Sequence, residues 1–425
     1  MAQFPTIEQL SKAKTDSELS HESRGLVAVV RFSSSSSGVD FVFQGTGVAE
    51  VRAATGDAAV TISASDAFWN TALKLEDGAP IPGYESLTMA QTSGLSVSGD
   101  FLGVIAPYQL ALQRLFILFL DIARPVKRHP FVETFRDTDT AVGRYVWVKA
   151  NGTEARIYYE EAGTGPIPFL LQATAGADSR QYRYFLADPV LQKRFRLIAY
   201  DLPYHGKSMP PSDDRWWEKK YLPDVDYLMS WVVGLADALS LDQPWFMGCS
   251  VGGQLALDLA AEHKDRFGAF FSLNGWYDCP PTFKSLSNDI FRTPSISPHL
   301  FSANMIGACS PLAPEFNVHE VQWIYASNYP GIYAGDNDYF ASGHDMKRNG
   351  HKIDGKKPVY LLTGQYDHTT HDKEHGAPAV AKNIPSIKFR VLKGLSHFTM
   401  SDDPIAFRNT LLPILDEALA ETKSV

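Results

Sequence analysis

A serine, Ser250, stands between two glycines, each two residues away, in the segment 248–252. A serine hydroxyl is a weak nucleophile, so it reacts where a base can reach it and where backbone N–H groups face the developing oxyanion. Glycines at Gly248 and Gly252 let neighbouring backbone approach without a clash at Cβ. The spacing therefore predicts that Ser250 is a nucleophile, while Cys249, at a strand end, is expected to pack in the interior.

The segments on either side of Ser250 fit that chemistry. An apolar run at 244–247 predicts a short buried strand, and the apolar spacing of 254–261 predicts a helix. The Gly-x-Ser-x-Gly motif requires a strand, a sharp turn and a helix in this order, because the turn then exposes the hydroxyl at the end of the strand. The local sequence supplies all three elements.

From residue 143 onward, strand and helix patterns alternate, which predicts a mostly parallel sheet covered on both faces. The predicted strands are 144–149, 155–160, 168–172, 196–200, 244–248, 269–273, 358–363 and 388–392. The predicted helices are about 180–187, 224–240, 251–264, 374–383 and 404–421. With the Ser250 motif after the fifth strand, this part of the chain resembles the α/β-hydrolase family. The resemblance implies an α/β fold with an eight-stranded sheet at 143–425 and a helical cap inserted at about 276–350.

The resemblance also implies an acid and a base for Ser250. In the family the three residues follow in the order serine, acid, histidine. Asp367 follows the predicted strand 358–363, and His397 follows the next predicted strand. His397 would take the Ser250 proton, and Asp367 would hold the imidazole in the required tautomer. Asp278, which follows an earlier strand, is an alternative acid.

An oxyanion site is implied as well. In the family it combines the N–H of the residue after the serine, here Val251, with an N–H from the loop after the third strand. That loop begins with Ala173 and Thr174, where the family most often has His-Gly. Ala175 is therefore expected as the second donor, on a loop of unusual geometry.

Other histidines invite different interpretations. His205 lies in the segment 201–208, which resembles the family's Asp-x-x-Gly-x-Gly-x-Ser turn with Tyr204 in place of the first glycine, and a structural role is expected. A second group of closely spaced residues could suggest a zinc site: His368, His371, Asp372 and His375. A serine triad needs no metal, so no metal or cofactor is expected.

The predicted cap is rich in aromatic residues. Most of them are expected to form its core, and the remainder to line an apolar pocket that excludes water. The candidate pocket residues are Thr174, Trp276, Tyr277, Trp323 and Tyr325. Such a pocket favours a small hydrophobic substrate.

The first 120 or so residues follow a different pattern. Candidate strands at 39–44, 48–53 and 58–62 precede a helix near 66 and a long amphipathic helix at 108–122. This order resembles the sterol-carrier-protein-2-like fold, an α+β domain that encloses an apolar tunnel. The expected boundaries are this domain at 1–122 and a linker at 123–142. The domain is expected to pack or to form a homodimer, and lipid carriage is the alternative.

Composition narrows the class of protein. A net charge of −9 argues against a nucleic-acid or anionic-membrane partner. Three widely spaced cysteines give no disulfide framework, and the start lacks the pattern of a secretory signal, so a cytoplasmic location is expected. Gln109, Gln113 and Arg114 interrupt the apolar stretch at 101–120, so no membrane span is expected.

The leading functional hypothesis is hydrolysis of a hydrophobic, aromatic or prenylated ester or lactone through an acyl-enzyme on Ser250. A cyclase, isomerase or acyl transferase would use the same residues without net hydrolysis. A carbon–carbon bond hydrolase is a further alternative.

Overall fold

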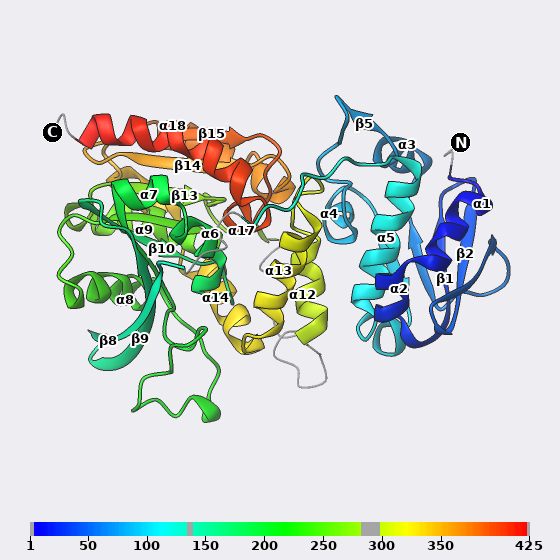
Figure 1. Ribbon diagram of the computed structural model, residues 1–425, viewed down its shortest axis with the longest axis horizontal. Helices are drawn as coiled ribbons and strands as arrows, with labels where there is room; N and C mark the ends of the chain where they lie inside the picture. Colours follow the sequence, from blue (N-terminus) through cyan, green and yellow to red (C-terminus); the bar gives the residue numbers. More distant parts are fainter. Residues whose placement is uncertain (1–3, 134–138, 282–297, 423–425) are drawn as a thin grey trace. The chain divides into compact units, whose positions relative to one another are not determined.

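The structure is a computed structural model that describes residues 4–133, 139–281 and 298–422. The chain divides into two compact units (Figure 1). The first unit is Met1–His129 together with Pro294–Ala313, and the second is Pro130–Thr293 together with Pro314–Val425. Among the described residues, no helix combines the length and the apolar character needed to cross a membrane.

The second unit is built on an eight-stranded sheet in the order β15-β14-β13-β12-β10-β11-β9-β8. Its strands are β8 (Val142–Ala150), β9 (Thr153–Ala162), β10 (Ile167–Gln172), β11 (Phe195–Tyr200), β12 (Trp245–Cys249), β13 (Phe270–Leu273), β14 (Val359–Gly364) and β15 (Lys388–Leu392). The pairs β8–β9 and β9–β11 are antiparallel, and the other neighbours are parallel. The eight predicted strands and the mostly parallel sheet are therefore confirmed.

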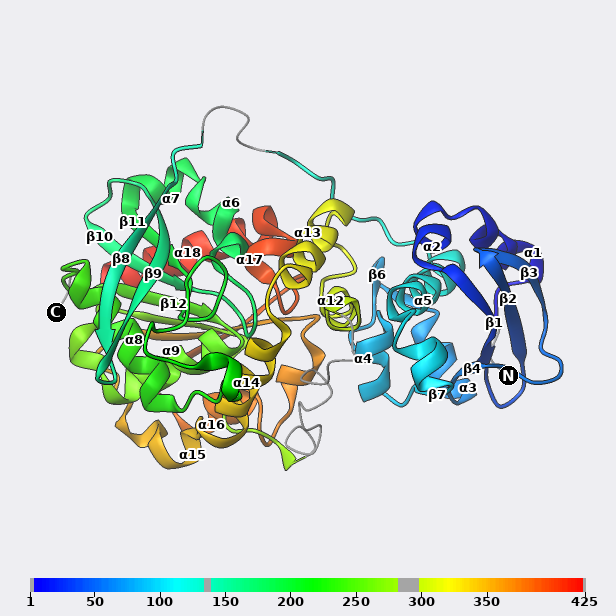
Figure 2. The same ribbon diagram turned by 90° about the horizontal axis from the view of Figure 1, so that it is seen from below.

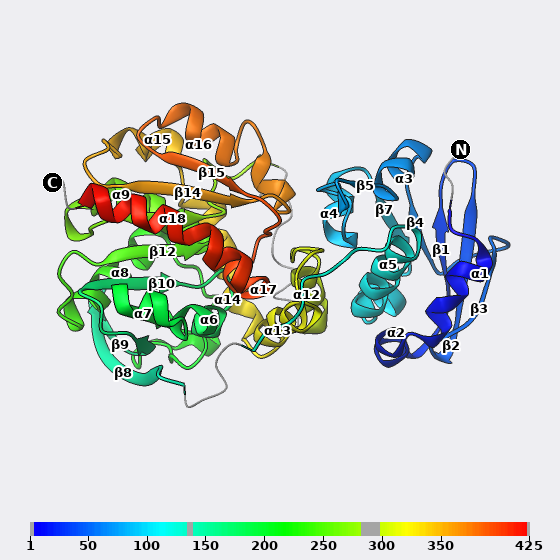
Figure 3. The same cartoon turned by 45° about the horizontal axis from the view of Figure 1, so that its top comes forward.

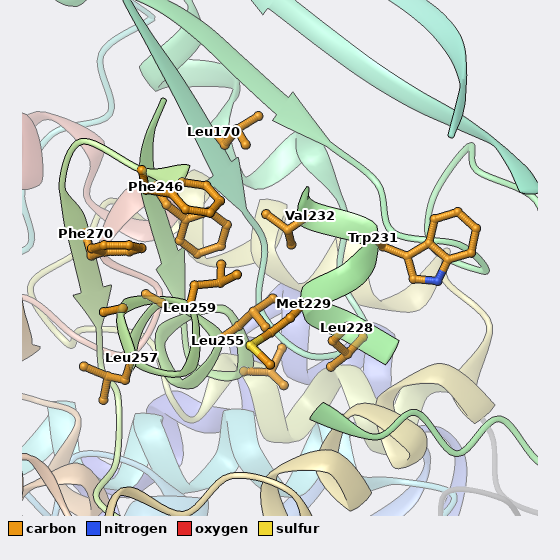
Figure 4. Packing of buried hydrophobic residues seen from close by; sticks show 14 of the residues in the cluster. Leu170, Leu228, Met229, Trp231, Val232, Phe246, Leu255, Leu257, Leu259 and Phe270 are labelled. Carbon is orange, nitrogen blue, oxygen red and sulfur yellow. The ribbon is translucent and has the colours of Figure 1, made fainter. Parts of the chain in front are cut away.

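Helices cover both faces of this sheet. Alternate residues of a strand point to opposite faces, so neighbours such as Leu170 and Leu171 belong to different cores. Leu170 and Phe246 pack against α8 (Val225–Ala238) and α9 (Val251–Glu262), as Figure 4 shows. The opposite core includes α7 (Pro189–Arg194) and α18 (Pro404–Thr422), which crosses that face in red in Figure 3.

The first unit contains a five-stranded sheet in the order β3-β2-β1-β4-β7. Its strands are β1 (Arg24–Ser33), β2 (Gly38–Thr46), β3 (Val48–Ala53), β4 (Val60–Ser63) and β7 (Ser96–Gly99). The central strand β1 was not predicted. The helix α5 (Gln109–Ala123) packs on the sheet (Figure 2), and its Phe119 stacks on Phe32 of β1 with ring centroids 4.6 Å apart.

The expected cap at about 276–350 is not one body. Residues 294–313 belong to the first unit, where α12 (Pro298–Ile306) packs near α5. The Ser86 hydroxyl donates to the carbonyl of Gly307 at 2.5 Å. The second unit keeps α13 (Glu315–Ala326), α14 (Pro330–Ser342) and α15 (Met346–Asn349). Residues 282–297 of the predicted insertion lie outside the described residues.

Candidate active site

Ser250 lies at the sharp turn between β12 and α9. Its backbone has φ 57° and ψ −116°, a conformation that a residue with a side chain rarely adopts. A Cβ on Gly248 would lie 2.2 Å from the carbonyl oxygen of Gly252, and one on Gly253 would lie 2.3 Å from that of Leu273. The glycines are therefore required by close backbone approach, and the strained turn presents the Ser250 side chain at the end of the strand.

His397 and Asp367 form a hydrogen-bonded pair. The His397 Nδ1 lies 2.6 Å from Asp367 Oδ2, and 1% of the Asp367 side chain is exposed against 20% for His397. Burial alone would lower the pKa of His397, but the adjacent Asp367 carboxylate outweighs it and raises that pKa above its ordinary value. With Nδ1–H directed at the carboxylate, Nε2 of the neutral ring is left as the proton acceptor.

Two side chains join this pair to the turn at Ser250. The thiol of Cys249 lies 3.0 Å from the carbonyl oxygen of His397. The Asn274 amide donates to the same carbonyl at 2.9 Å, and its Oδ1 accepts the N–H of Gly364 at the end of β14 at 2.9 Å. The residue next to Ser250 and the loop carrying His397 are thus held together. The sequence reasoning missed Asn274, whose partners lie about 90 and 120 residues away.

Cys249 as an alternative nucleophile and Asp278 as an alternative acid do not fit the structure. Cys249 is fully buried, and burial raises the pKa of its thiol far above the ordinary value, so it is not a reactive thiolate. Asp278 lies 2.8 Å from both Lys347 Nζ and His375 Nδ1. The acid that contacts His397 is therefore Asp367 and not Asp278.

The loop after β10 forms a β-turn over residues 174–177. The N–H of Ala177 donates to the carbonyl of Thr174 at 3.2 Å, and Gly176 has φ +66°, as the third residue of a type II turn requires. The N–H groups of Thr174 and Gly176 donate to the side chains of Gln181 (3.0 Å) and Asp336 (2.7 Å). Within the described part of the chain, the intervening N–H of Ala175 makes no hydrogen bond.

This turn lies beside the Ser250 turn. Gln172, at the end of β10, pairs with Gly248 of β12. A Cβ on Gly252 would lie 2.8 Å from Gln172 Cγ and 3.0 Å from the carbonyl oxygen of Ala173. The N–H of Val251, at the first position of α9, is one of the donors that a helix leaves without an intrahelical partner. The structure therefore brings Val251 and Ala175 to adjacent turns.

The candidate pocket residues do not gather at one place. Thr174 and Tyr325 share a hydrogen bond between their hydroxyls, and the Tyr325 ring lies 5.6 Å from that of Phe398, next to His397. Burial raises the pKa of Tyr325 well above its ordinary value, so its phenol stays protonated. By contrast, Trp276 packs on Phe340 with ring centroids 5.6 Å apart.

Two of the candidates have exposed or polar surroundings. The expectation that Trp323 lines a buried pocket is corrected, because 71% of its surface is exposed. Tyr277 is half-buried, and its N–H donates to the carbonyl of His375 at 2.7 Å. Thr174 and Tyr325 are therefore the two pocket candidates that the structure places beside His397 and the 174–177 turn.

His371, His375 and His205 each contact a different protein group. His371 Nε2 lies 3.0 Å from the carbonyl oxygen of Gly364, while His375 pairs with Asp278, so the two do not face a common centre. No group of three or more metal-binding side chains occurs among the residues that the structure describes. His205 is buried, with its Nε2 2.9 Å from Asp336 Oδ2.

Comparison with known proteins agrees with this architecture. The sequence model of a family described as alpha/beta hydrolase fold matches residues 167–305. The second unit is similar in fold to a thermophilic esterase from Thermogutta terrifontis (19% identity, TM-score 0.54, covering 65% of this chain and 99% of that one). It is similarly close to the enol-lactonase from Burkholderia xenovorans LB400 (21% identity, TM-score 0.53, covering 64% and 99%).

Curated relatives match over a shorter part of the chain. A 2-hydroxy-6-oxononadienedioate/2-hydroxy-6-oxononatrienedioate hydrolase of Burkholderia vietnamiensis is 25% identical over 173 residues, which are 39% of this chain and 58% of that protein. A 2-hydroxy-6-oxo-6-phenylhexa-2,4-dienoate hydrolase of Comamonas testosteroni is 33% identical over 115 residues, 26% of this chain and 37% of that protein. The chain thus spans less than two thirds of the length of these relatives.

Proposed function

We propose that this chain, whose second unit has the α/β-hydrolase fold, is a hydrolase that uses Ser250 as nucleophile, His397 as general base and Asp367 as the residue that orients His397. The observation that carries the proposal is the hydrogen-bonded His397–Asp367 pair, held to the strained Ser250 turn through Cys249. The expected donors to the oxyanion are the N–H groups of Val251 and Ala175.

The reaction would proceed in two halves. His397 Nε2 takes the hydroxyl proton as Ser250 Oγ attacks a substrate carbonyl, and the N–H donors receive the oxyanion. The bond to the leaving group breaks, its electron pair departs with that group, and His397 returns the proton there. A water molecule deprotonated by His397 then attacks the acyl carbon, which frees the acid and restores Ser250.

The sequence led us to expect ester hydrolysis, but the named relatives favour hydrolysis of a carbon–carbon bond. The relatives' named substrates, 2-hydroxy-6-oxo-dienoates, carry a ketone and carboxylates but no ester. Hydrolysis of such a compound must break the carbon–carbon bond beside the 6-oxo group. Once the 2-hydroxy group has become a ketone, the electron pair of the broken bond can delocalise towards it. We therefore propose a vinylogous 1,5-diketone acid as the substrate class.

Ester or lactone hydrolysis stays the second candidate. An alkoxide leaving group needs only the proton that His397 has accepted, so the same three residues suffice without an electron sink in the substrate. The cyclase, isomerase and transferase alternatives need water to be excluded, and no described feature favours them over hydrolysis.

Covalent labelling tests the nucleophile. We expect a fluorophosphonate to add once to the wild-type protein and to Cys249→Ala, but not to Ser250→Ala, as read by intact mass. The neighbouring Cys249 variant is the matched control, because it disturbs the same turn without removing the hydroxyl. Labelling that persists in Ser250→Ala would refute the proposed nucleophile.

Product analysis tests the substrate class. With 2-hydroxy-6-oxo-6-phenylhexa-2,4-dienoate, carbon–carbon hydrolysis yields benzoate and a five-carbon 2-hydroxydienoate, with one water consumed. An aryl butyrate assayed in parallel reports ester hydrolysis. Turnover of the butyrate with no loss of the dienoate would favour the second candidate.

For the first unit we propose a packing or homodimer role rather than lipid carriage. Aromatic side chains fill the space between its sheet and α5: Phe32, Trp69, Phe116 and Phe119 are fully buried, and their rings contact one another. A full-length protein that binds an apolar fluorescent fatty acid with 1:1 stoichiometry, and keeps doing so in Ser250→Ala, would contradict this view.

A further inference from the structure

We propose that Asp336, on α14, is a positioning residue that fixes the 174–177 turn so that the Ala175 N–H faces the carbonyl attacked by Ser250. This inference deepens the proposed function and rests on it. Asp336 would hold the loop in place of the histidine that the family most often has there, because this chain has Ala173 at that position.

The first observation is the contact between Asp336 and the turn. One carboxylate oxygen, Oδ2, accepts the N–H of Gly176 at 2.7 Å and lies 2.9 Å from His205 Nε2. The Asp336 and His205 side chains are 1% and 2% exposed, so both hydrogen bonds are shielded from water. A buried carboxylate is costly unless it is paired, and here His205 pairs it.

His205 is itself anchored. Its Nδ1 lies 3.0 Å from the carbonyl oxygen of Pro203, so that ring nitrogen carries a proton and Nε2 is directed at Asp336. Burial would lower the pKa of His205, but the charge of Asp336 outweighs it and raises that pKa. The turn after β11, which contains His205, and the helix α14 are thereby locked together beside the 174–177 turn.

The second observation is how the turn uses its N–H groups. The carbonyl of Thr174 accepts from Ala177, and an amide N–H points opposite to its carbonyl, so the N–H of the Thr174–Ala175 peptide is directed out of the turn. Gln181 holds the N–H before it and Asp336 the N–H after it. Two buried side chains therefore fix the turn on both sides of Ala175 and leave its N–H for a ligand.

The third observation is steric. A Cβ on Gly176 would lie 2.7 Å from Cβ of Tyr333, one turn of α14 before Asp336. Gly176 also has the positive φ that favours glycine. The helix thus packs directly on the turn backbone, and Asp336 is the polar group with which it holds that backbone.

The experiment compares kinact and KI for fluorophosphonate labelling of Ser250 in full-length variants, because the phosphoryl oxygen occupies the oxyanion site during this reaction. In Asp336→Ala we expect kinact to fall about 10- to 100-fold, less than or similar to the loss of one oxyanion donor, with KI within about 3-fold. Asp336→Asn should recover part of the rate, because its amide oxygen can take the place of Oδ2 and still accept the N–H of Gly176.

Asp258 offers a matched control. It is also buried and paired with a histidine, His344 Nδ1 at 3.0 Å, but it lies on α9 and makes no described contact with the 174–177 turn. Asp258→Ala should lower the melting temperature at least as much as Asp336→Ala while kinact stays within about 3-fold of the wild type. Equal losses of kinact in both variants would reduce Asp336 to a general structural role and overturn the proposal.

Two further outcomes are decisive. If Asp336→Ala does not fold, Asp336→Glu takes its place, since it keeps the charge but displaces the oxygen that Gly176 needs, and an unchanged kinact there overturns the proposal. If the wild-type protein itself is not labelled, the proposed function fails. If it is labelled and the Asp336 variants react equally fast, the positioning role alone fails.

Discussion

At the scale of single residues, His397 and Asp367 determine how activity should depend on pH. The proposed base must be neutral, so activity is lost as pH falls through the pKa of His397. Because the Asp367 carboxylate raises that pKa above the ordinary 6.5, the acid limb of kcat/KM should have its midpoint above 6.5. A pH profile of wild-type activity measures this midpoint, and a value below 6 would contradict the pairing.

The Asp367→Asn variant carries the same argument further. Without the carboxylate, the imidazolium loses its stabilising charge, so the acid limb should move to lower pH. The rate above that limb should also fall about 10³- to 10⁴-fold, because an amide favours the wrong imidazole tautomer. Asp278→Asn is the control and should leave both the midpoint and the rate unchanged.

Some of these residues could be predicted from sequence and others could not. Local spacing predicts Ser250 as the nucleophile, and the resemblance to the α/β-hydrolase family implies Asp367 and His397 at the ends of predicted strands. Asn274 and Asp336 act on backbone groups more than 85 residues away, and nothing in their local sequence marks them. Their roles depend on tertiary contacts, which spacing does not encode.

At the scale of elements, Asn274 ties the ends of β13 and β14 to the loop that carries His397. Its own backbone has φ +54°, which asparagine tolerates better than most residues. In Asn274→Ala, the Gly364 N–H and the His397 carbonyl would each lose a buried partner, which should destabilise the second unit by about 2 kcal/mol. Loss of fluorophosphonate labelling with increasing urea reports this unit specifically.

A second asparagine, Asn383, serves as a control for the destabilisation expected in Asn274→Ala. Asn383 donates to the carbonyl of Ala379 within its own helix, α16 (Ala377–Asn383), and lies on the surface side of the unit. Asn383→Ala should change the urea midpoint little, by about 0.5 kcal/mol or less. If the two variants unfold at the same urea concentration, Asn274 does not tie the strand ends as described.

The elements themselves show where sequence patterns succeed. The inner strands β10, β12 and β14 of the large sheet are largely buried on both faces and appear as short apolar runs, which separates them from the amphipathic helices. The strand β1 is missing from the prediction although residues 26–30 are apolar, because the serine run at 33–37 is typical of a flexible segment and the predicted strands begin after it. The structure makes that run a hairpin turn, with Ser34 N–H donating to Ser37 at 2.8 Å.

At the scale of the whole molecule, the first unit is discontinuous. Two hydrogen bonds join the segment 294–313 to the earlier part of this unit. The Ser86 hydroxyl donates to the carbonyl of Gly307, and the His129 N–H donates to the carbonyl of Leu312 at 2.7 Å. The sequence could not reveal this, since 294–313 reads as part of the cap inserted in the second unit. The segment 294–313 packs in the first unit although the residues before and after it in sequence belong to the second unit.

The discontinuity predicts how a fragment will behave. Residues 1–129 expressed alone should melt at a lower temperature than the same fragment with 294–313 joined by a flexible linker, because the shorter piece lacks the segment that covers α5 and Ser86. Differential scanning calorimetry of the two fragments measures the difference. Identical melting temperatures would show that the returning segment contributes nothing to the first unit.

The same discontinuity sets an order of events during synthesis. The ribosome must translate all of residues 130–293 before the segment 294–313 that completes the first unit can emerge. At about 5–20 residues per second, translating these 164 residues takes about 8–33 seconds. During that interval the first unit lacks the segment that packs on α5, so part of α5 stays exposed. Chaperone binding to nascent chains should therefore peak before residue 313 has left the exit tunnel.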